Sequence, residues 1–170
     1  MVPGRGGEER DILGEEPTRG LLEARLIASL ATLNADGSVH VVPMWFLRDG
    51  EALLIPTNHA TRKAKNLERD PRATVMIDDS RGAFEICGVT LVGRVEIVRV
   101  PESFELNRRI HLKYLTERGL ALEPVRGYLS TDDITLRFLP ERMTSFDMRG
   151  TEQARLLLES GEYHRLTPVL

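Results

Sequence analysis

The chain has 170 residues, a formal net charge of −3 and an apolar content of 41%, which together predict one globular domain with a sizeable core. The weak negative charge gives no support for nucleic acid or an anionic membrane as a partner. The single cysteine, Cys87, excludes an internal disulfide framework and a zinc site built from cysteines. No apolar run approaches the roughly 20 residues that span a bilayer, and the N-terminus has no hydrophobic signal region, so we expect a cytoplasmic protein.

The first part of the chain predicts a meander of antiparallel strands. Residues 1–17 are rich in Gly, Glu and Arg and are expected to form a flexible arm, and a short helix is predicted over 18–24. Strands are predicted over 25–33, 38–47 and 51–57. The turns between them contain Asp-Gly pairs, which are typical of hairpins. In the first strand, the even-numbered residues from Leu26 to Thr32 are expected to share one face.

A short helical pattern follows the third strand, from about Thr61 to Arg69, and Pro71 ends it. The Thr61 hydroxyl is suited to cap this helix. Arg62 and Lys63 then occupy the first turn, where the helix dipole disfavours cations. A bound phosphate would reverse that argument, because the backbone N–H groups, the Thr61 hydroxyl and both cations can hold it. The alternative is that the two cations are only solvated.

The second part of the chain adds strands and a longer helix. Strands are predicted over 73–77, 84–99 and 133–139, with 143–148 as a continuation of the last strand after Pro140, and helices are predicted over 101–118 and 151–160. Gly88 and Gly93 interrupt the long strand and are expected to mark bulges or bends. The apolar positions expected on the longer helix are Phe104, Ile110, Leu112 and Leu115. The whole pattern predicts a mainly β fold, a small six-stranded antiparallel barrel with helices packed outside it.

The sequence contains no constellation typical of a hydrolase or a metal enzyme. No Gly-x-Ser-x-Gly motif occurs, and Cys87 has no paired histidine motif. None of the histidines has the spacing of metal ligands; they are His40, His59, His111 and His164. We therefore predict no catalytic side chain and no metal site, and we expect any chemistry to come from a bound cofactor.

Three short motifs, Thr57-Asn58, Thr61-Arg62-Lys63 and Asp70-Pro71-Arg72, resemble the cofactor-phosphate segment of the pyridoxamine 5′-phosphate oxidase-like split-barrel superfamily. The resemblance keeps the order and spacing of the motifs. It implies a six-stranded antiparallel split β-barrel that forms a homodimer, with FMN or its 5-deazaflavin relative, coenzyme F-420, bound between the subunits. The domains expected are a flexible N-terminal arm (1–17), a split-barrel flavin-binding domain (18–150) and a C-terminal helix with its tail (151–170).

The resemblance also implies a set of cofactor-binding residues on a strand, at the end of the next strand, at the helix start and near the C-terminus. They are Val42, Pro43, Met44, Trp45, Thr57, Thr61, Arg62, Lys63 and Phe146. In the family the first strand lies along the flavin ring, the end of the next meets the ring and ribityl chain, and the helix start holds the phosphate. Phe146 takes the place of an aromatic residue that the other subunit supplies. For Met44, Trp45 and Phe146, packing within the core is the alternative.

Departures from the true oxidase argue against vitamin B6 chemistry. The oxidase has a flavin-contacting glutamine where this sequence has Gly88, and its basic residue for the substrate phosphate aligns with Trp45-Phe46. Its residues that hold pyridoxal phosphate have no match in 101–118. The closer resemblance is to bacterial FMN- or deazaflavin-dependent oxidoreductases, which implies hydride transfer to a small conjugated organic molecule. The alternative is a non-catalytic flavin- or haem-binding module for storage, sensing or delivery.

Two more cations on the short helix bear on the choice of cofactor. Lys65 and Arg69 follow Arg62 at i+3 and i+7, so the three side chains can share one helix face. Such a face would extend the positive charge toward the longer acidic tail of the deazaflavin. An ordinary solvated helix face has the same spacing.

Overall fold

The computed structural model describes residues 13, 18–82, 84–123, 125–129 and 133–162. Leu13 is the one described residue of the predicted arm over 1–17, and it is fully buried in the core. The rest of the arm and the predicted tail beyond residue 162 lie outside the described residues. None of the described helices is long and apolar enough to span a bilayer.

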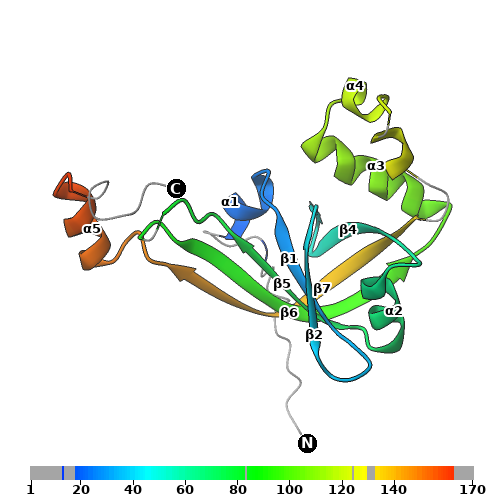
Figure 1. The fold of residues 1–170 in the computed structure, drawn as a ribbon, viewed down its shortest axis with the longest axis horizontal. Coiled ribbons are helices and arrows are strands. Elements are labelled where there is room, and N and C mark those ends of the chain that lie inside the picture. Colours follow the sequence, from blue (N-terminus) through cyan, green and yellow to red (C-terminus); the bar gives the residue numbers. More distant parts are fainter. Residues whose placement is uncertain (1–12, 14–17, 83, 124, 130–132, 163–170) are drawn as a thin grey trace, which may run out of the picture.

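One antiparallel sheet of seven strands forms the body of the described chain (Figure 1). The strands are β1 Ala28–Leu33, β2 Val39–Met44, β3 Leu47–Asp49, β4 Ala52–Asn58, β5 Arg72–Asp78, β6 Cys87–Val98 and β7 Asp133–Asp147. Across the sheet they are ordered β2-β1-β5-β6-β7-β4-β3. The helices are α1 Thr18–Glu23, α2 Arg62–Arg69, α3 Glu102–Tyr114, α4 Glu117–Leu120, the 3-10 helix η2 Val125–Tyr128 and α5 Glu152–Glu159. The predicted mainly β architecture with peripheral helices is confirmed.

The structure corrects the predicted number of strands from six to seven. The strand predicted over 38–47 divides, because β2 ends at Met44 and β3 begins at Leu47. Between them Phe46 leaves the ladder, and its N–H donates to the Tyr114 hydroxyl while its carbonyl accepts from that hydroxyl, each at 3.1 Å. β2 and β3 then lie at opposite edges of the sheet, and no ladder joins these edges within the described part of the chain. The sheet is therefore not closed into a complete barrel.

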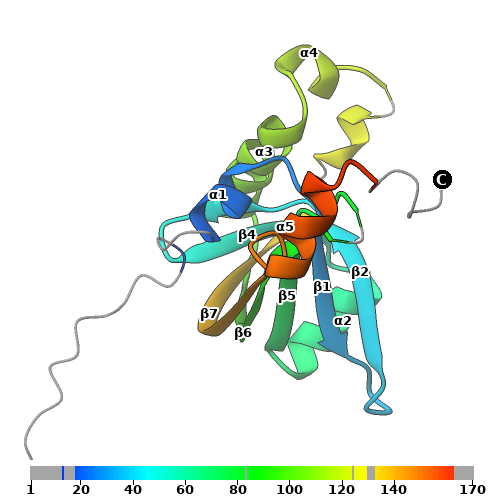
Figure 2. The ribbon, with the colours of Figure 1, turned by 90° about the vertical axis from the view of Figure 1, so that its left-hand side faces the viewer.

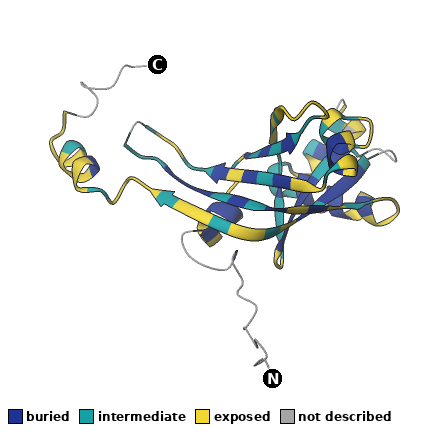
Figure 3. Ribbon diagram, turned by 90° about the horizontal axis from the view of Figure 1, so that it is seen from below, coloured by how far each residue is buried: buried dark blue, intermediate teal, exposed yellow. Residues whose placement is uncertain are grey.

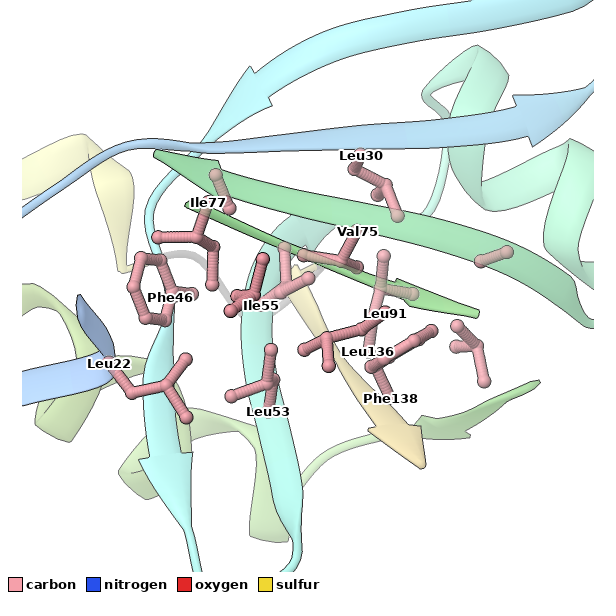
Figure 4. Packing of buried hydrophobic residues seen from close by; sticks show 14 of the residues in the cluster. Leu22, Leu30, Phe46, Leu53, Ile55, Val75, Ile77, Leu91, Leu136 and Phe138 are labelled. Carbon is pink, nitrogen blue, oxygen red and sulfur yellow. The ribbon is translucent and has the colours of Figure 1, made fainter. Parts of the chain in front are cut away.

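The core fills the inner side of the curved sheet. In β1 the even-numbered residues are buried and the odd-numbered ones are half-buried, which confirms the predicted alternation. Figure 4 shows Leu30 of β1, Ile55 of β4, Val75 of β5, Leu91 of β6 and Phe138 of β7 in one cluster, and all five are fully buried. Each such side chain contributes about 1.5–3 kcal/mol through its burial. Most strands of the sheet therefore depend on this single cluster.

β6 and β7 continue past the other strands as a two-stranded ribbon, with α5 at its end (Figure 1). Figure 2 views the molecule from that end, and Figure 3 shows the exposed residues along the outer part of β7. The register shifts between Val92 and Gly93, which confirms a bulge at Gly93. No register shift occurs at Gly88, so the ladder has no bulge there. A Cβ there would lie 2.5 Å from Cζ of Phe146 and 2.8 Å from the Ile77 carbonyl oxygen, so Gly88 permits a close approach.

α3 is shorter than predicted, and its buried face differs in part from the predicted one. It ends at Tyr114 rather than near Arg118, because Thr116 caps the separate helix α4 by accepting from the Gly119 N–H. Phe104 is 43% exposed, so its predicted place on the apolar face is wrong. The buried face consists of Ser103, Leu106, Asn107, Ile110 and His111. Ile110 is buried as predicted, but because this face is partly polar, counting apolar residues does not identify the other residues on it.

We expect Gly93→Ala to lower the free energy of unfolding by about 2 kcal/mol or more, as in other overpacked sites. The added Cβ would collide with the Leu139 carbonyl oxygen across the bulge, and a backbone atom cannot rotate away. Urea unfolding followed by circular dichroism measures the change. Gly150→Ala is the matched control, because no atom lies within 4 Å of its added Cβ. Equal stability of the two variants would contradict this account of the bulge.

Candidate functional site

The chain between β4 and α2 folds into a tight turn that Asn58 and Thr61 hold. The Asn58 carbonyl oxygen accepts from the Thr61 N–H at 3.1 Å and from the Thr61 hydroxyl at 2.8 Å. The Asn58 side-chain oxygen accepts from the Ala60 N–H at 2.9 Å. Thr61 also caps α2, as predicted, because its Oγ1 accepts from the Ala64 N–H at 3.4 Å. The turn thereby fixes the direction in which α2 begins.

The first turn of α2 leaves two backbone donors for a ligand. Within the described residues, the N–H groups of Arg62 and Lys63 have no acceptor, as is usual at the start of a helix. Thr57 is buried at the end of β4, with its hydroxyl 3.2 Å from that of Thr61. Because the Thr61 hydrogen is donated to Asn58, Thr57 is the donor in this contact. The Thr57 hydrogen is thus used within the site, and the Thr57 oxygen is left as an acceptor near the helix start.

Lys63 is a partly buried cation that has no counter-ion within the described part of the chain. Burial lowers the pKa of its ammonium group, because desolvation disfavours the charged form. A nearby anion would favour that form again. The first turn of α2 therefore carries two free backbone donors, the positive end of the helix dipole and an unpaired lysine, which is a combination suited to a phosphate group.

Arg62 and Lys63, which the sequence placed together, lie on different surfaces. Arg62 lines an open cavity of about 610 Å³ together with Lys65 and Arg69, as their spacing along the helix predicts. We call this cavity the basic pocket. Its lining residues are Asn34, Ala35, Asp36, Ala60, Arg62, Lys65, Asn66 and Arg69. Lys63 is not one of them, so the helix presents one cation at its start and a row of three along its side.

The wall of the basic pocket opposite α2 is the turn between β1 and β2, which the sequence did not predict as part of a site. Asn66 of α2 is buried and donates from Nδ2 to Oγ1 of Thr32 at 3.1 Å and to Oδ1 of Asn34 at 3.0 Å. Arg69 donates to the Leu33 carbonyl oxygen. These bonds hold the turn against the helix. The sequence signal was an asparagine on the buried side of an amphipathic helix.

β2, the predicted ring-contact strand, is an edge strand with one inward and one outward side. Val42 and Met44 pack against the core, whereas Pro43 is exposed. Trp45 stacks on Tyr114, with ring centroids 4.9 Å apart and an interplanar angle of 9°. The side chains of Met44 and Trp45 therefore make the core contacts that were the alternative to a cofactor role. β2 offers a ligand its outward side and its unpaired backbone edge.

Phe146 lies far from α2 within one chain. α2 leads into β5, whose last residue, Asp78, pairs with Gly88, and Gly88 pairs with Phe146. β5 is seven residues long, a span of roughly 20 Å. The structure therefore brings Thr57, Thr61 and Lys63 together, whereas Phe146 of the same chain lies at the other end of β5.

The chain is similar to known proteins over most of its length. The family model described as pyridoxamine 5′-phosphate oxidase matches residues 15–128. An F420 reductase structure is 26% identical, with a TM-score of 0.63 over 76% of this chain and 98% of that one. A conserved hypothetical protein from Mycobacterium tuberculosis is 27% identical, with a TM-score of 0.67 over 84% of this chain and 91% of that one.

A third similar structure extends the likeness of the fold alone. It is the heme storage protein of Vibrio cholerae, which is 22% identical, with a TM-score of 0.59 over 76% of this chain and 90% of that one. No curated protein matches the sequence.

Proposed function

This chain belongs to the pyridoxamine 5′-phosphate oxidase family, whose model matches residues 15–128, and we propose that it is an oxidoreductase that binds FMN. It transfers hydride to a small conjugated organic molecule. Residues 18–150 are the cofactor-binding domain, to which the C-terminal helix and tail over 151–170 are attached. Oxidation of pyridoxamine 5′-phosphate itself is not expected, because the sequence lacks the substrate-binding residues of the oxidase.

The observation that carries this proposal is the unpaired Lys63 at the start of α2. A cation that is partly desolvated and has no counter-ion costs stability. The free N–H groups of Arg62 and Lys63 lie at the same place. A phosphate offsets the cost of the ammonium and accepts from both N–H groups, with charge-assisted hydrogen bonds worth about 1.5–3 kcal/mol each. FMN ends in such a phosphate.

When bound, FMN supplies the hydride transfer. The part of the chain is to bind and orient it. The Thr57 hydroxyl oxygen lies near the helix start, where it can accept from a hydroxyl group of the ribityl chain. The outward side of β2, with Pro43, lies along the ring, and the unpaired backbone edge of β2 serves the polar edge of the ring. Val42, Met44 and Trp45 hold that strand in place from the core side.

A second copy of the chain completes the site in this proposal. The outer face of β2, β1 and β5 exposes Val39, Val41 and Met76 by 62%, 57% and 37%. Such a patch is costly on a monomer, and a two-fold homodimer would cover it. Phe146 lies roughly 20 Å from α2 in its own chain. An aromatic contact to the cofactor would therefore come from Phe146 of the partner subunit.

Coenzyme F-420 is the second candidate cofactor, and the basic pocket is the observation that favours it. The deazaflavin carries an acidic tail beyond its phosphate. Arg62, Lys65 and Arg69 line one open cavity beside the helix start, which would suit such a tail. FMN has no group to place there.

We expect Lys63→Ala to weaken FMN binding by about 1.5–3 kcal/mol, or roughly 10- to 100-fold, because it removes the charge that faces the phosphate. A fluorescence titration measures the dissociation constant. Since burial lowers the pKa of Lys63 and the phosphate binds its charged form, the affinity of the wild-type chain should fall as the pH rises through that lowered pKa. The alanine variant should lose this dependence.

Lys65→Ala is the matched control for that experiment. It removes a cation from the same helix that lines the basic pocket instead of the helix start. FMN binding should change little, whereas binding of coenzyme F-420 should weaken if its tail enters the pocket. An unchanged FMN affinity for Lys63→Ala would contradict the phosphate site. Equal effects of Lys65→Ala on both cofactors would remove the support for the deazaflavin.

Turnover distinguishes an oxidoreductase from a module that only stores a flavin or haem. Bound FMN, reduced chemically, should be reoxidised by a panel of quinones and α,β-unsaturated carbonyls faster than free reduced FMN under the same anaerobic conditions. Stopped-flow absorbance of the oxidised flavin follows the reaction. If the chain binds FMN but does not accelerate this reaction, the oxidoreductase proposal is contradicted and a non-catalytic storage module is favoured.

The homodimer predicts a mass twice the 19.1 kDa of one chain in light scattering at micromolar concentration. Val41→Lys should reduce the dimer and FMN affinity together, because it places a charge on the outer sheet face. Leu156→Lys is the control, since Leu156 is also exposed but lies on α5. A wild-type mass near 19.1 kDa would refute this assembly.

A further inference from the structure

The turn that precedes α2 is tied to a residue far along the chain. Asn58 donates from Nδ2 to Oδ1 of Asp133 at 3.3 Å, and the two residues are 75 positions apart in the sequence. They also face each other across the β4–β7 ladder. The place of the turn therefore depends on the first residue of β7.

The start of β7 is in turn held by α3 through buried polar groups. The Ser103 hydroxyl donates to the Asp133 carbonyl oxygen at 2.9 Å. The Thr135 hydroxyl donates to Oδ1 of Asn107 at 2.8 Å, and Nδ2 of Asn107 donates to the Ile134 carbonyl oxygen at 3.4 Å. Ser103, Asn107 and Thr135 are all buried. Because an unmade bond of a buried polar group is costly, this network resists displacement.

The carboxylate of Asp133 selects one orientation of the Asn58 amide. An ionised carboxylate only accepts hydrogen bonds, so the amide turns its NH₂ group toward Asp133. The amide oxygen then faces the Ala60 N–H, from which it accepts at 2.9 Å. In the opposite orientation two donors would meet at Ala60 and two acceptors at Asp133. The contact with Asp133 thus preserves the hydrogen bonds that shape the turn.

From this geometry we propose that Asn58, held by Asp133, is a positioning residue for the anion site at the start of α2. Its carbonyl oxygen holds Thr61 and its side chain holds Ala60. Together these bonds aim the N–H groups of Arg62 and Lys63 at the phosphate of the ligand. The inference rests on the proposed function, since it presumes a phosphate at that place. It assigns to Asn58 and Asp133 no contact with the ligand.

If Asn58 and Asp133 have this role, changing them should weaken binding of the phosphate and leave binding of the flavin ring unchanged. β4 and β7 lie toward one edge of the sheet, whereas β2 is the strand at the other edge. A displaced turn would misplace the donors at the helix start and leave β2 where it is. FMN and riboflavin differ only in the phosphate. The ratio of their dissociation constants therefore isolates the contribution of the anion site from the general stability of the fold.

The experiment measures the dissociation constants of FMN and riboflavin for the wild-type chain and its variants by fluorescence titration. Asp133→Ala should reduce the preference for FMN roughly ten-fold, the value of one hydrogen bond to a charged group, with riboflavin binding unchanged. Asp133→Asn should restore most of the preference, because its side-chain oxygen can still accept from Asn58. Asn58→Ala should reduce the preference for FMN at least as much as Asp133→Ala does. It also provides an independent measurement if Asp133→Ala does not fold.

Asp49→Ala is the matched control. Asp49 also ends a strand and ties it to α3, through a bond of 2.8 Å from Nη2 of Arg109, but it does not contact the turn. The Asp49→Ala variant should therefore prefer FMN over riboflavin as strongly as the wild-type chain does.

The outcomes separate this inference from the proposed function. If the wild-type chain binds FMN no better than riboflavin, the phosphate site fails and the positioning role fails with it. If the wild-type chain prefers FMN and Lys63→Ala abolishes that preference while Asp133→Ala and Asn58→Ala retain it, only the positioning role is overturned. Equal weakening of both ligands by Asp133→Ala, or no recovery in Asp133→Asn, would also overturn it.

Discussion

The short connection between β2 and β3, the strands at the two edges of the sheet, is the constraint on which the rest of the fold depends. β2 and β3 are the two edge strands, yet Trp45 and Phe46 alone connect them. Buried backbone groups that leave a ladder need other partners. The Tyr114 hydroxyl accepts from the Phe46 N–H, and its single hydrogen is shared between the carbonyl oxygens of Leu26 at 2.8 Å and Phe46 at 3.1 Å. Because Trp45 stacks on the same ring, α3 is fixed across the opening of the sheet.

That attachment lets one helix support both halves of the candidate site. The C-terminal end of α3 holds Phe46, just after β2, the proposed ring-contact strand, through Tyr114. Its N-terminal end holds the start of β7 through Ser103, and β7 holds the turn of Asn58. The ring and the phosphate of a flavin would thus meet surfaces that are set by the same rigid element. Precise donor geometry at a ligand requires such support behind the contacting residues.

Features that depend on neighbours in the sequence could be predicted from it, and features that depend on distant residues could not. The Thr61 cap and the bulge at Gly93 follow from local rules, and both are present. The break of the strand at Phe46 was missed because its partner, Tyr114, is 68 residues away. The cations of the basic pocket were predicted, but its opposite wall was missed, because that wall requires Asn66 of α2 to meet the β1–β2 turn through a bond to Thr32 that spans 34 residues. The order of the elements and the family were therefore predictable, whereas the division of the site into two basic surfaces was not.

The pairing of Gly88 with Phe146 explains why the departure from the true oxidase is more than the loss of one contact. A glutamine at position 88 would need a Cβ 2.5 Å from Cζ of Phe146, 2.8 Å from the Ile77 carbonyl oxygen and 2.9 Å from Cβ of Asp78. Contacts below about 3 Å are not tolerated in a packed structure. The Ile77 carbonyl oxygen is a backbone atom and cannot rotate away, so the backbone observed here does not accept a glutamine at position 88. Since Gly88 pairs with the last residue of β5 on one side and with Phe146 of β7 on the other, the chain cannot regain the glutamine by a substitution at that position alone.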